Sequence, residues 1–210
     1  MNEAELERGL ISLRKRETAL RIVIGLYLVC TTVALSLWGT IIGRGIDQDG
    51  DDPLLLAAGL SGGLYAVLFI ASIVAVCFWL HRAHANLFIA GIQDLKFKPN
   101  WAVGWYFVPF AFWFKPFQAM QELWKSSHLA DEGLSERTDG KLIVWWACWI
   151  LGNMIANLSM KKSSGFTSAI NLLDLTGYAF HIVAAAVLLM IVNAVTKAQS
   201  SEMSVRHAFA

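Results

Sequence analysis

The feature that most constrains this chain is its set of long stretches without a charged side chain. Residues 22–43, 54–80 and 142–160 contain no Asp, Glu, Lys or Arg, and residues 163–196 contain one, Asp174. About 20 apolar residues in a helix cross a bilayer core of about 30 Å. Lipid cannot hydrogen-bond an open strand edge, so helix is the expected structure. We therefore predict an all-α integral membrane protein with four transmembrane helices, over about 22–43, 54–80, 142–160 and 170–196.

Composition and charge agree with a membrane location. The chain is 56% hydrophobic and 16% charged, whereas soluble domains average about 45–50% and about 25%. The formal net charge of +1 and the lack of a basic stripe argue against nucleic acid as a partner. The three cysteines lie in separate spans without CxxC spacing, so we expect no metal site. His81 and His181 fall at different depths, which argues against haem, and we expect no cofactor.

The two ends of the chain are polar. Residues 1–21 are predicted to form a cytoplasmic amphipathic leader, with Leu6, Leu10 and Leu13 on one face and basic side chains around them. Such a helix lies on an anionic membrane surface, and its charges should keep the N-terminus inside. Residues 22–196 then form a single transmembrane domain, and residues 197–210 a polar tail.

Residues 100–124 contain ten of the chain's 25 aromatic residues and are interrupted by Pro109. If residues 101–114 cross the membrane, the protein has five transmembrane helices, and ten of the 17 Lys and Arg residues lie on the cytoplasmic side. If residues 101–114 enter the membrane and return to the same side, 14 of the 17 lie on the cytoplasmic side. The positive-inside bias favours the second arrangement. As a helix, 101–114 would also rise only about 21 Å. We predict a re-entrant element over 101–114 and an interfacial helix over 116–130, with five spans as the alternative.

Three motifs resemble a known family. They are W-x2-R-x3-N at Trp79, Arg82 and Asn86, the run "PNWAVGWYFVP" at 99–109, and "KPFQAMQELW" at 115–124. Together they resemble a bacterial membrane family known as domain of unknown function 4328, over about residues 55–195. The stretch "FWFK" at 112–115 departs from the family, whose members often have a polar residue near 112–113 and Arg at 115. The resemblance implies a multi-pass protein of the bacterial inner membrane and implies no activity.

Two groups of residues are candidate sites. The first is a headgroup or ligand site on the cytoplasmic side, because basic side chains there attract anionic lipid. Its residues are Arg82, Asn86, Lys96, Lys98 and Lys115. The second is an intramembrane polar ladder, in which a hairpin near residue 165 would bring Asn157 level with Asp174 and Asn153 level with Tyr178. Its residues are Asp174, Tyr178, His181, Asn153 and Asn157.

These sites lead to three hypotheses about function. The preferred one is a non-enzymatic binding or scaffold component that contacts membrane lipid, a membrane-protein partner or a second copy of the chain. The alternative is a small transporter or channel component that uses the polar ladder. The second alternative is an intramembrane serine hydrolase, because residues 59–62 read GLSG and place Ser61 as a nucleophile with His181 as its base.

Overall fold

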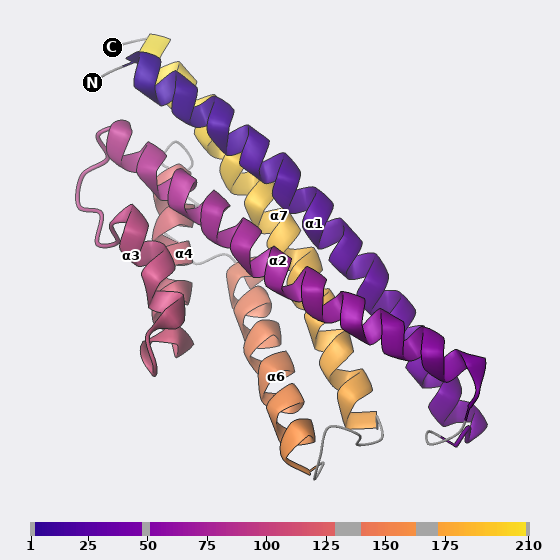
Figure 1. Ribbon diagram of the computed structural model, residues 1–210. Helices are drawn as coiled ribbons and strands as arrows, with labels where there is room; N and C mark the ends of the chain where they lie inside the picture. The colour runs from indigo at the N-terminus through magenta and orange to yellow at the C-terminus, as the bar shows by residue number, and fades with distance from the viewer. Residues whose placement is uncertain (1–2, 48–50, 129–139, 163–171, 209–210) are drawn as a thin grey trace. The chain divides into compact units, whose positions relative to one another are not determined.

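The computed structural model describes residues 3–47, 51–128, 140–162 and 172–208, and every regular element in these ranges is helical. Figure 1 shows the elements in chain order; η1 and η2 are short 3-10 turns. They are α1 (Glu3–Arg44), α2 (Pro53–Ile89), α3 (Pro99–Gly104), η1 (Trp105–Phe107), η2 (Ala111–Trp113), α4 (Lys115–Ser127), α6 (Gly140–Lys162) and α7 (Leu172–Ala208). In the described part of the chain, four helices are long and apolar enough to cross a membrane: α1, α2, α6 and α7. This confirms the all-α fold with four potential spans.

Two glycines end the first two helices by the same geometry. Gly45 and Gly91 have φ of 64° and 71°, which a residue without a Cβ adopts at little cost. After each glycine, the next amide bonds back to a carbonyl five residues earlier, Ile46 to Ile41 at 3.0 Å and Ile92 to Leu87 at 3.1 Å. This is the Schellman arrangement, which satisfies the last carbonyls of a helix.

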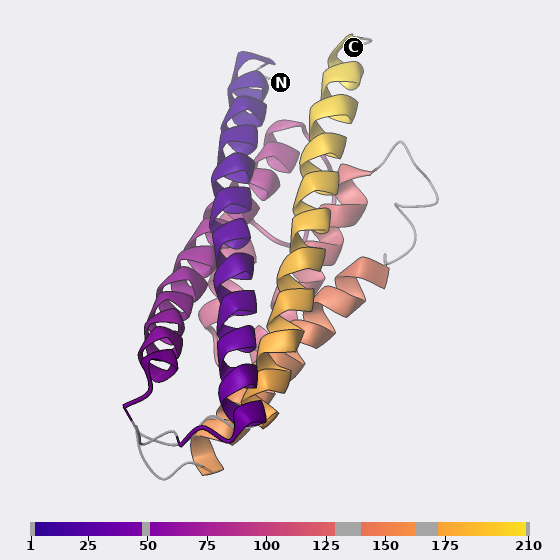
Figure 2. The same cartoon turned by 90° about the vertical axis from the view of Figure 1, so that its right-hand side faces the viewer.

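The four long helices each contribute to two compact units. Unit 1 comprises residues 1–22, 73–143 and 188–210, and unit 2 comprises residues 23–72 and 144–187. Unit 1 therefore contains the N-terminal part of α1, the C-terminal parts of α2 and α7, and all of α3 and α4. Figure 2 shows the N-terminal end of α1 and the C-terminal end of α7 at the same end of the molecule.

The predicted leader and tail differ from the structure. Residues 3–21 are the first part of the continuous helix α1, and Leu6 and Leu13 are buried in unit 1 rather than left for a membrane surface. Residues 197–208 likewise continue α7, and Gln199 is fully buried. Sequence reasoning failed here because a leucine stripe that packs on protein has the same spacing as one that packs on lipid.

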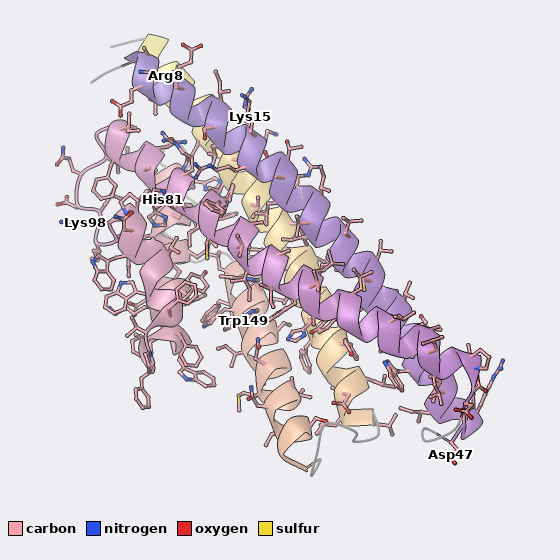
Figure 3. The ribbon with its side chains drawn as sticks, in the orientation of Figure 1. Arg8, Lys15, Asp47, His81, Lys98 and Trp149 are labelled. Atoms are coloured by element: carbon pink, nitrogen blue, oxygen red, sulfur yellow. The ribbon has the colours of Figure 1, made fainter. Side chains whose placement is uncertain are left out.

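A short helical hairpin, α3 and α4 with their connecting turns, completes unit 1 (Figure 1). Its core is formed by Phe97, Ala102 and Ala119, with Trp105 packed beside them. His81 of α2 bonds to Asn100 of α3 at 2.8 Å, close to the exposed Lys98 (Figure 3). Residues 101–114 form no spanning helix, so the five-helix alternative is not what the structure shows.

The predicted interfacial helix 116–130 corresponds to α4, which ends at Ser127; residues 129 and 130 lie outside the described ranges. Its apolar face was expected to lie on the membrane. Instead Met120 and Trp124 are fully buried in protein. Four exposed aromatic side chains lie at the turn between α3 and α4: Phe107, Phe110, Trp113 and Phe114.

Unit 2 packs α6 closely against α7. A Cβ built on Gly152 of α6 would lie 2.5 Å from Cδ2 of His181, and one on Gly177 of α7 would lie 3.4 Å from Ile155. Nothing lies within 4 Å of a Cβ built on Gly59 or Gly63. Within unit 2, the glycines that allow close helix approach are therefore on α6 and α7.

Candidate functional site

One candidate site is a pocket of about 660 Å³ in unit 1, formed by α4 and the segment that enters α3. It is lined by Lys96, Phe97, Trp105, Lys115, Gln118, Gln121, Glu122, Lys125 and Ser126. Residues 118, 121, 122 and 125 lie on the side of α4 opposite the buried face that carries Met120 and Trp124. The amphipathic pattern of α4 therefore divides the helix between the protein core and the pocket.

Glu122 fixes the shape of this pocket. Its Oε2 accepts a hydrogen bond from the backbone N–H of Lys96 at 2.7 Å, and its Oε1 accepts one from the N–H of Phe97 at 3.0 Å. One carboxylate thus ties the irregular segment before α3 to the middle of α4. Hydrogen bonds to a charged acceptor are stronger than those between neutral groups, so Glu122 stabilises the attachment of this segment to α4.

Lys115 is held over two aromatic rings. Its Nζ lies 5.8 Å from the ring centroid of Phe97 and 5.7 Å from that of Trp105. Each distance is in the range of a cation–π contact. The ring faces hold the ammonium at the pocket wall without neutralising its charge.

The pocket carries a net positive charge. Three lysines, Lys96, Lys115 and Lys125, face one carboxylate, Glu122, and the remaining polar lining is neutral. In the described part of the chain, none of the three ammonium groups forms a salt bridge. The pocket is therefore suited to an anion with several acceptor oxygens.

Only part of the predicted basic site is assembled in this pocket. Lys96 and Lys115 line it, whereas Lys98 is exposed and precedes α3 outside the lining. Arg82 and Asn86 are not lining residues either. Sequence reasoning missed Lys125 and Glu122; their i, i+3 spacing on the polar face of α4 was the available signal.

Tyr106 follows the pocket residue Trp105 in the chain and lies outside the four candidate spans. Its hydroxyl is buried and has no hydrogen-bond partner among the described residues. Burial raises the pKa of Tyr106 above its ordinary value. The phenol therefore stays neutral and adds no charge to this part of unit 1.

The polar ladder in unit 2 is assembled differently from the prediction. Asn153 and Asn157 donate to carbonyls of their own helix, those of Trp149 and Asn153, at 2.7 and 2.8 Å. Level with Asp174 is Ala156, which lines a cavity of about 130 Å³ together with it. Neither Asn153 nor Asn157 lines this cavity, and α6 turns a neighbouring face, carrying Gly152 and Ala156, toward α7.

The residue that sequence reasoning missed in this cavity is Tyr65 of α2. Its hydroxyl lies 2.7 Å from Nδ1 of His181, and its ring meets that of Tyr178 edge-on at 5.0 Å. The cavity is lined by Tyr65, Ala156, Asp174, Gly177, Tyr178 and His181. In the sequence, Tyr65 could have been recognised as a candidate because it is a polar aromatic residue in the middle of an otherwise apolar span.

Ser61 is not paired with His181. Its hydroxyl donates to the carbonyl of Ala58 in its own helix at 2.7 Å, and Nδ1 of His181 is bonded to Tyr65. A serine nucleophile needs a base within hydrogen-bond reach. The expected nucleophile and base are therefore not brought together.

Comparison with known protein families agrees with the motifs. A family model described as Domain of unknown function (DUF4328) matches residues 55–197. The chain belongs to this family. No curated protein and no solved structure matches the chain. The DUF4328 match covers most of α2, all of α3, α4 and α6, and the greater part of α7; α1 precedes it.

The W-x2-R-x3-N motif, which lies within the DUF4328 match, joins helices inside unit 1. Nε1 of Trp79 donates to Oγ1 of Thr196 at 3.1 Å. Arg82 donates to Oδ1 of Asn86 at 2.8 Å, and Asn86 donates to Oε1 of Gln199 at 3.3 Å. The motif therefore links α2 to α7 through buried polar side chains. This explains why Arg82 and Asn86 do not line the pocket.

Proposed function

We propose that this DUF4328 protein is a non-enzymatic, membrane-embedded binding protein whose lysine pocket holds the anionic headgroup of a membrane lipid. The observation that carries the proposal is that one hairpin combines this pocket with a turn of exposed aromatic side chains. A headgroup and its acyl chains require these two surfaces next to each other.

The aromatic turn supplies the apolar surface. Phe110 is 82% exposed and Phe107 is 70% exposed, and Figure 3 shows ring side chains projecting from this end of the hairpin. Large exposed apolar patches mark sites that meet another apolar surface. A lipid leaflet offers such a surface, and the turn would then enter it in the re-entrant manner that residues 101–114 suggest.

The lysines supply the headgroup contacts. Lys96, Lys115 and Lys125 are compact cationic donors, and lysine binds phosphate as a point charge. Lys115 follows the aromatic turn directly and so lies where the apolar turn gives way to the polar pocket. Gln118 and Ser126 add neutral donors to the lining.

The charge distribution supports a cytoplasmic location for unit 1. Its sequence ranges contain 14 of the 17 Lys and Arg residues, and those of unit 2 contain Arg44, Lys161 and Lys162. Arg8 and Lys15 are exposed on the N-terminal part of α1 (Figure 3). Positively charged segments remain on the cytoplasmic side of a bacterial inner membrane, so the N-terminus and the pocket would both face the cytoplasm.

Lipid binding by the purified protein tests the proposal. The full chain is placed in nanodiscs that mix a zwitterionic lipid with a small fraction of phosphatidylglycerol, and retained lipid is counted by native mass spectrometry. We expect the parent to retain phosphatidylglycerol preferentially. The triple variant Lys96→Gln, Lys115→Gln and Lys125→Gln should lose most of that preference.

A second triple variant controls for general charge. Lys15, Lys98 and Lys197 are exposed lysines of unit 1 outside the pocket lining, and changing all three to Gln removes the same charge. Equal losses in the two triple variants would contradict a specific pocket. Retention of a protein or a second copy of the chain, without lipid preference, would instead favour a protein-binding role.

A further inference from the structure

The cavity in unit 2 has no part in the proposed lipid binding, and its lining is chemically distinct. It has a volume of about 130 Å³. A water molecule takes about 30 Å³ of liquid, so the cavity has room for a small solute. All its polar lining groups belong to residues within the candidate spans: Tyr65 of α2, and Asp174, Tyr178 and His181 of α7.

The protein leaves one polar side chain of this cavity incompletely hydrogen-bonded. His181 is 6% exposed, and its Nε2 is buried without a hydrogen-bond partner among the described residues, while Nδ1 is bonded to Tyr65. A buried polar nitrogen without a partner is unfavourable. The position of the His181 imidazole also depends on the lack of a side chain at Gly152, because a Cβ there would overlap the ring. The packing of α6 on α7 therefore makes room for a side chain that is not fully satisfied by protein.

The lining selects the charge of the solute. Asp174 is a carboxylate, which repels anions and attracts cations in a region of low dielectric constant. Tyr65 and Tyr178 present aromatic rings at the same cavity, and Tyr65 packs in turn on Tyr27 and Phe69. Aromatic ring faces attract cations, and organic ammonium groups are recognised in this way.

A divalent metal fits the lining less well. Structural and catalytic zinc sites use three or four protein ligands, whereas the cavity offers one carboxylate and one imidazole. In the described part of the chain, no three His, Cys, Asp or Glu residues are grouped to hold a metal ion. A cation that is bound by one carboxylate, hydrogen-bond acceptors and rings suits the site better.

We propose that the cavity between α2, α6 and α7 in unit 2 binds a small ammonium-type cation, such as ammonium itself or a short primary alkylamine. Asp174 provides the counter-charge, the rings of Tyr65 and Tyr178 form the wall, and the imidazole of His181 takes part in the hydrogen bonding. The site is separate from the lysine pocket, and either can be occupied without the other.

Equilibrium binding of radiolabelled methylammonium to the full chain in nanodiscs tests this proposal. We expect saturable binding that unlabelled ammonium displaces and that sodium chloride at the same ionic strength does not. Asp174→Asn should weaken the binding at least about tenfold, a loss equivalent to about 1.4 kcal/mol. Asp47→Asn, which removes an exposed carboxylate elsewhere in unit 2, should leave the affinity unchanged.

A second variant keeps the test decisive if Asp174→Asn fails to fold. Gly152→Ala places a methyl group against His181 and should also weaken methylammonium binding. The proposal is overturned if the parent shows no saturable binding, if sodium competes as well as ammonium, or if a folded Asp174→Asn or Gly152→Ala variant binds like the parent.

Discussion

Gln199 joins three helices of unit 1 through its side-chain amide. It is fully buried in α7. Its Nε2 donates to the carbonyl of Ala83 and to Oγ of Ser127, each at 3.1 Å, and its Oε1 accepts from Asn86. One amide thus connects α7 with α2 and α4, and buried polar groups of this kind are costly to leave unpaired.

Replacing Gln199 by Leu should therefore destabilise the protein. The change leaves the buried Asn86 amide without its acceptor and removes the donor to Ser127 Oγ, and each unsatisfied buried group costs about 1–3 kcal/mol. We expect a clearly lower midpoint of thermal unfolding in detergent. Gln93→Leu, at an exposed position of unit 1, is the matched control and should unfold like the parent. A Gln199→Leu variant as stable as the parent would show that this network does not support the fold.

Gly152 gives a second prediction at the residue scale. Gly152→Ala should destabilise unit 2, because overpacking a filled site costs about 1–3 kcal/mol and the added Cβ would lie 2.5 Å from the His181 ring. Gly59→Ala has open space around it and should be neutral or stabilising, since Ala favours helix by about 1 kcal/mol over Gly. Thermal unfolding of the two variants compares them directly, and the reverse order would contradict the described packing of α6 on α7.

At the scale of elements, the hairpin of α3 and α4 depends on Glu122. Glu122→Ala should release the segment before α3, because both carboxylate bonds to the amides of Lys96 and Phe97 are lost. Hydrogen–deuterium exchange should then accelerate at these two amides by about tenfold for each 1.4 kcal/mol lost.

Gln118→Ala is the control for this experiment. It shortens an exposed pocket residue on the same helix and should leave exchange at residues 96 and 97 unchanged. Equal acceleration in both variants would mean that the helix as a whole has loosened and that Glu122 has no special role.

The sequence predicts where the helices lie in the chain better than it predicts which face of each helix contacts a neighbouring helix. Uncharged runs locate the four long helices, and Gly45 and Gly91 end two of them, α1 and α2, because length, hydropathy and backbone geometry are local properties. The choice of face is not local. Asn153 and Ala156 are close in sequence, yet Ala156 lines the cavity with Asp174, whereas the Asn153 amide bonds to its own helix.

For the candidate sites, too, the sequence predicts local chemistry better than it predicts which residues meet in space. Lys96 and Lys115 were expected on chemical grounds and do share a pocket, whereas Arg82 lies in a structural network with Asn86. Gln199 was assigned to a polar tail, because a glutamine near the end of a chain looks solvated until the partners that bury it are known. A single sequence does not reveal which polar side chains are buried by partners that are distant in the chain.

For the whole molecule, the number of membrane crossings decides whether the lysine pocket can form at one membrane surface. Four crossings place both ends of the aromatic hairpin on the same side, and with them the lysines of the pocket. Five crossings would separate Lys98 from Lys125 across the bilayer, and a headgroup pocket containing Lys96 and Lys125 could not form at one surface.

Cysteine labelling in intact cells tests this claim most directly. In a background without Cys30, Cys77 and Cys148, single cysteines are introduced at Lys98, Lys125 and, as the external control, Asp47. With four crossings, we expect an impermeant maleimide to label Asp47→Cys from outside and to label Lys98→Cys and Lys125→Cys only after the membrane is permeabilised. Labelling of Lys125→Cys from outside, with Lys98→Cys still shielded, would mean that the aromatic segment crosses and would contradict the four-span account.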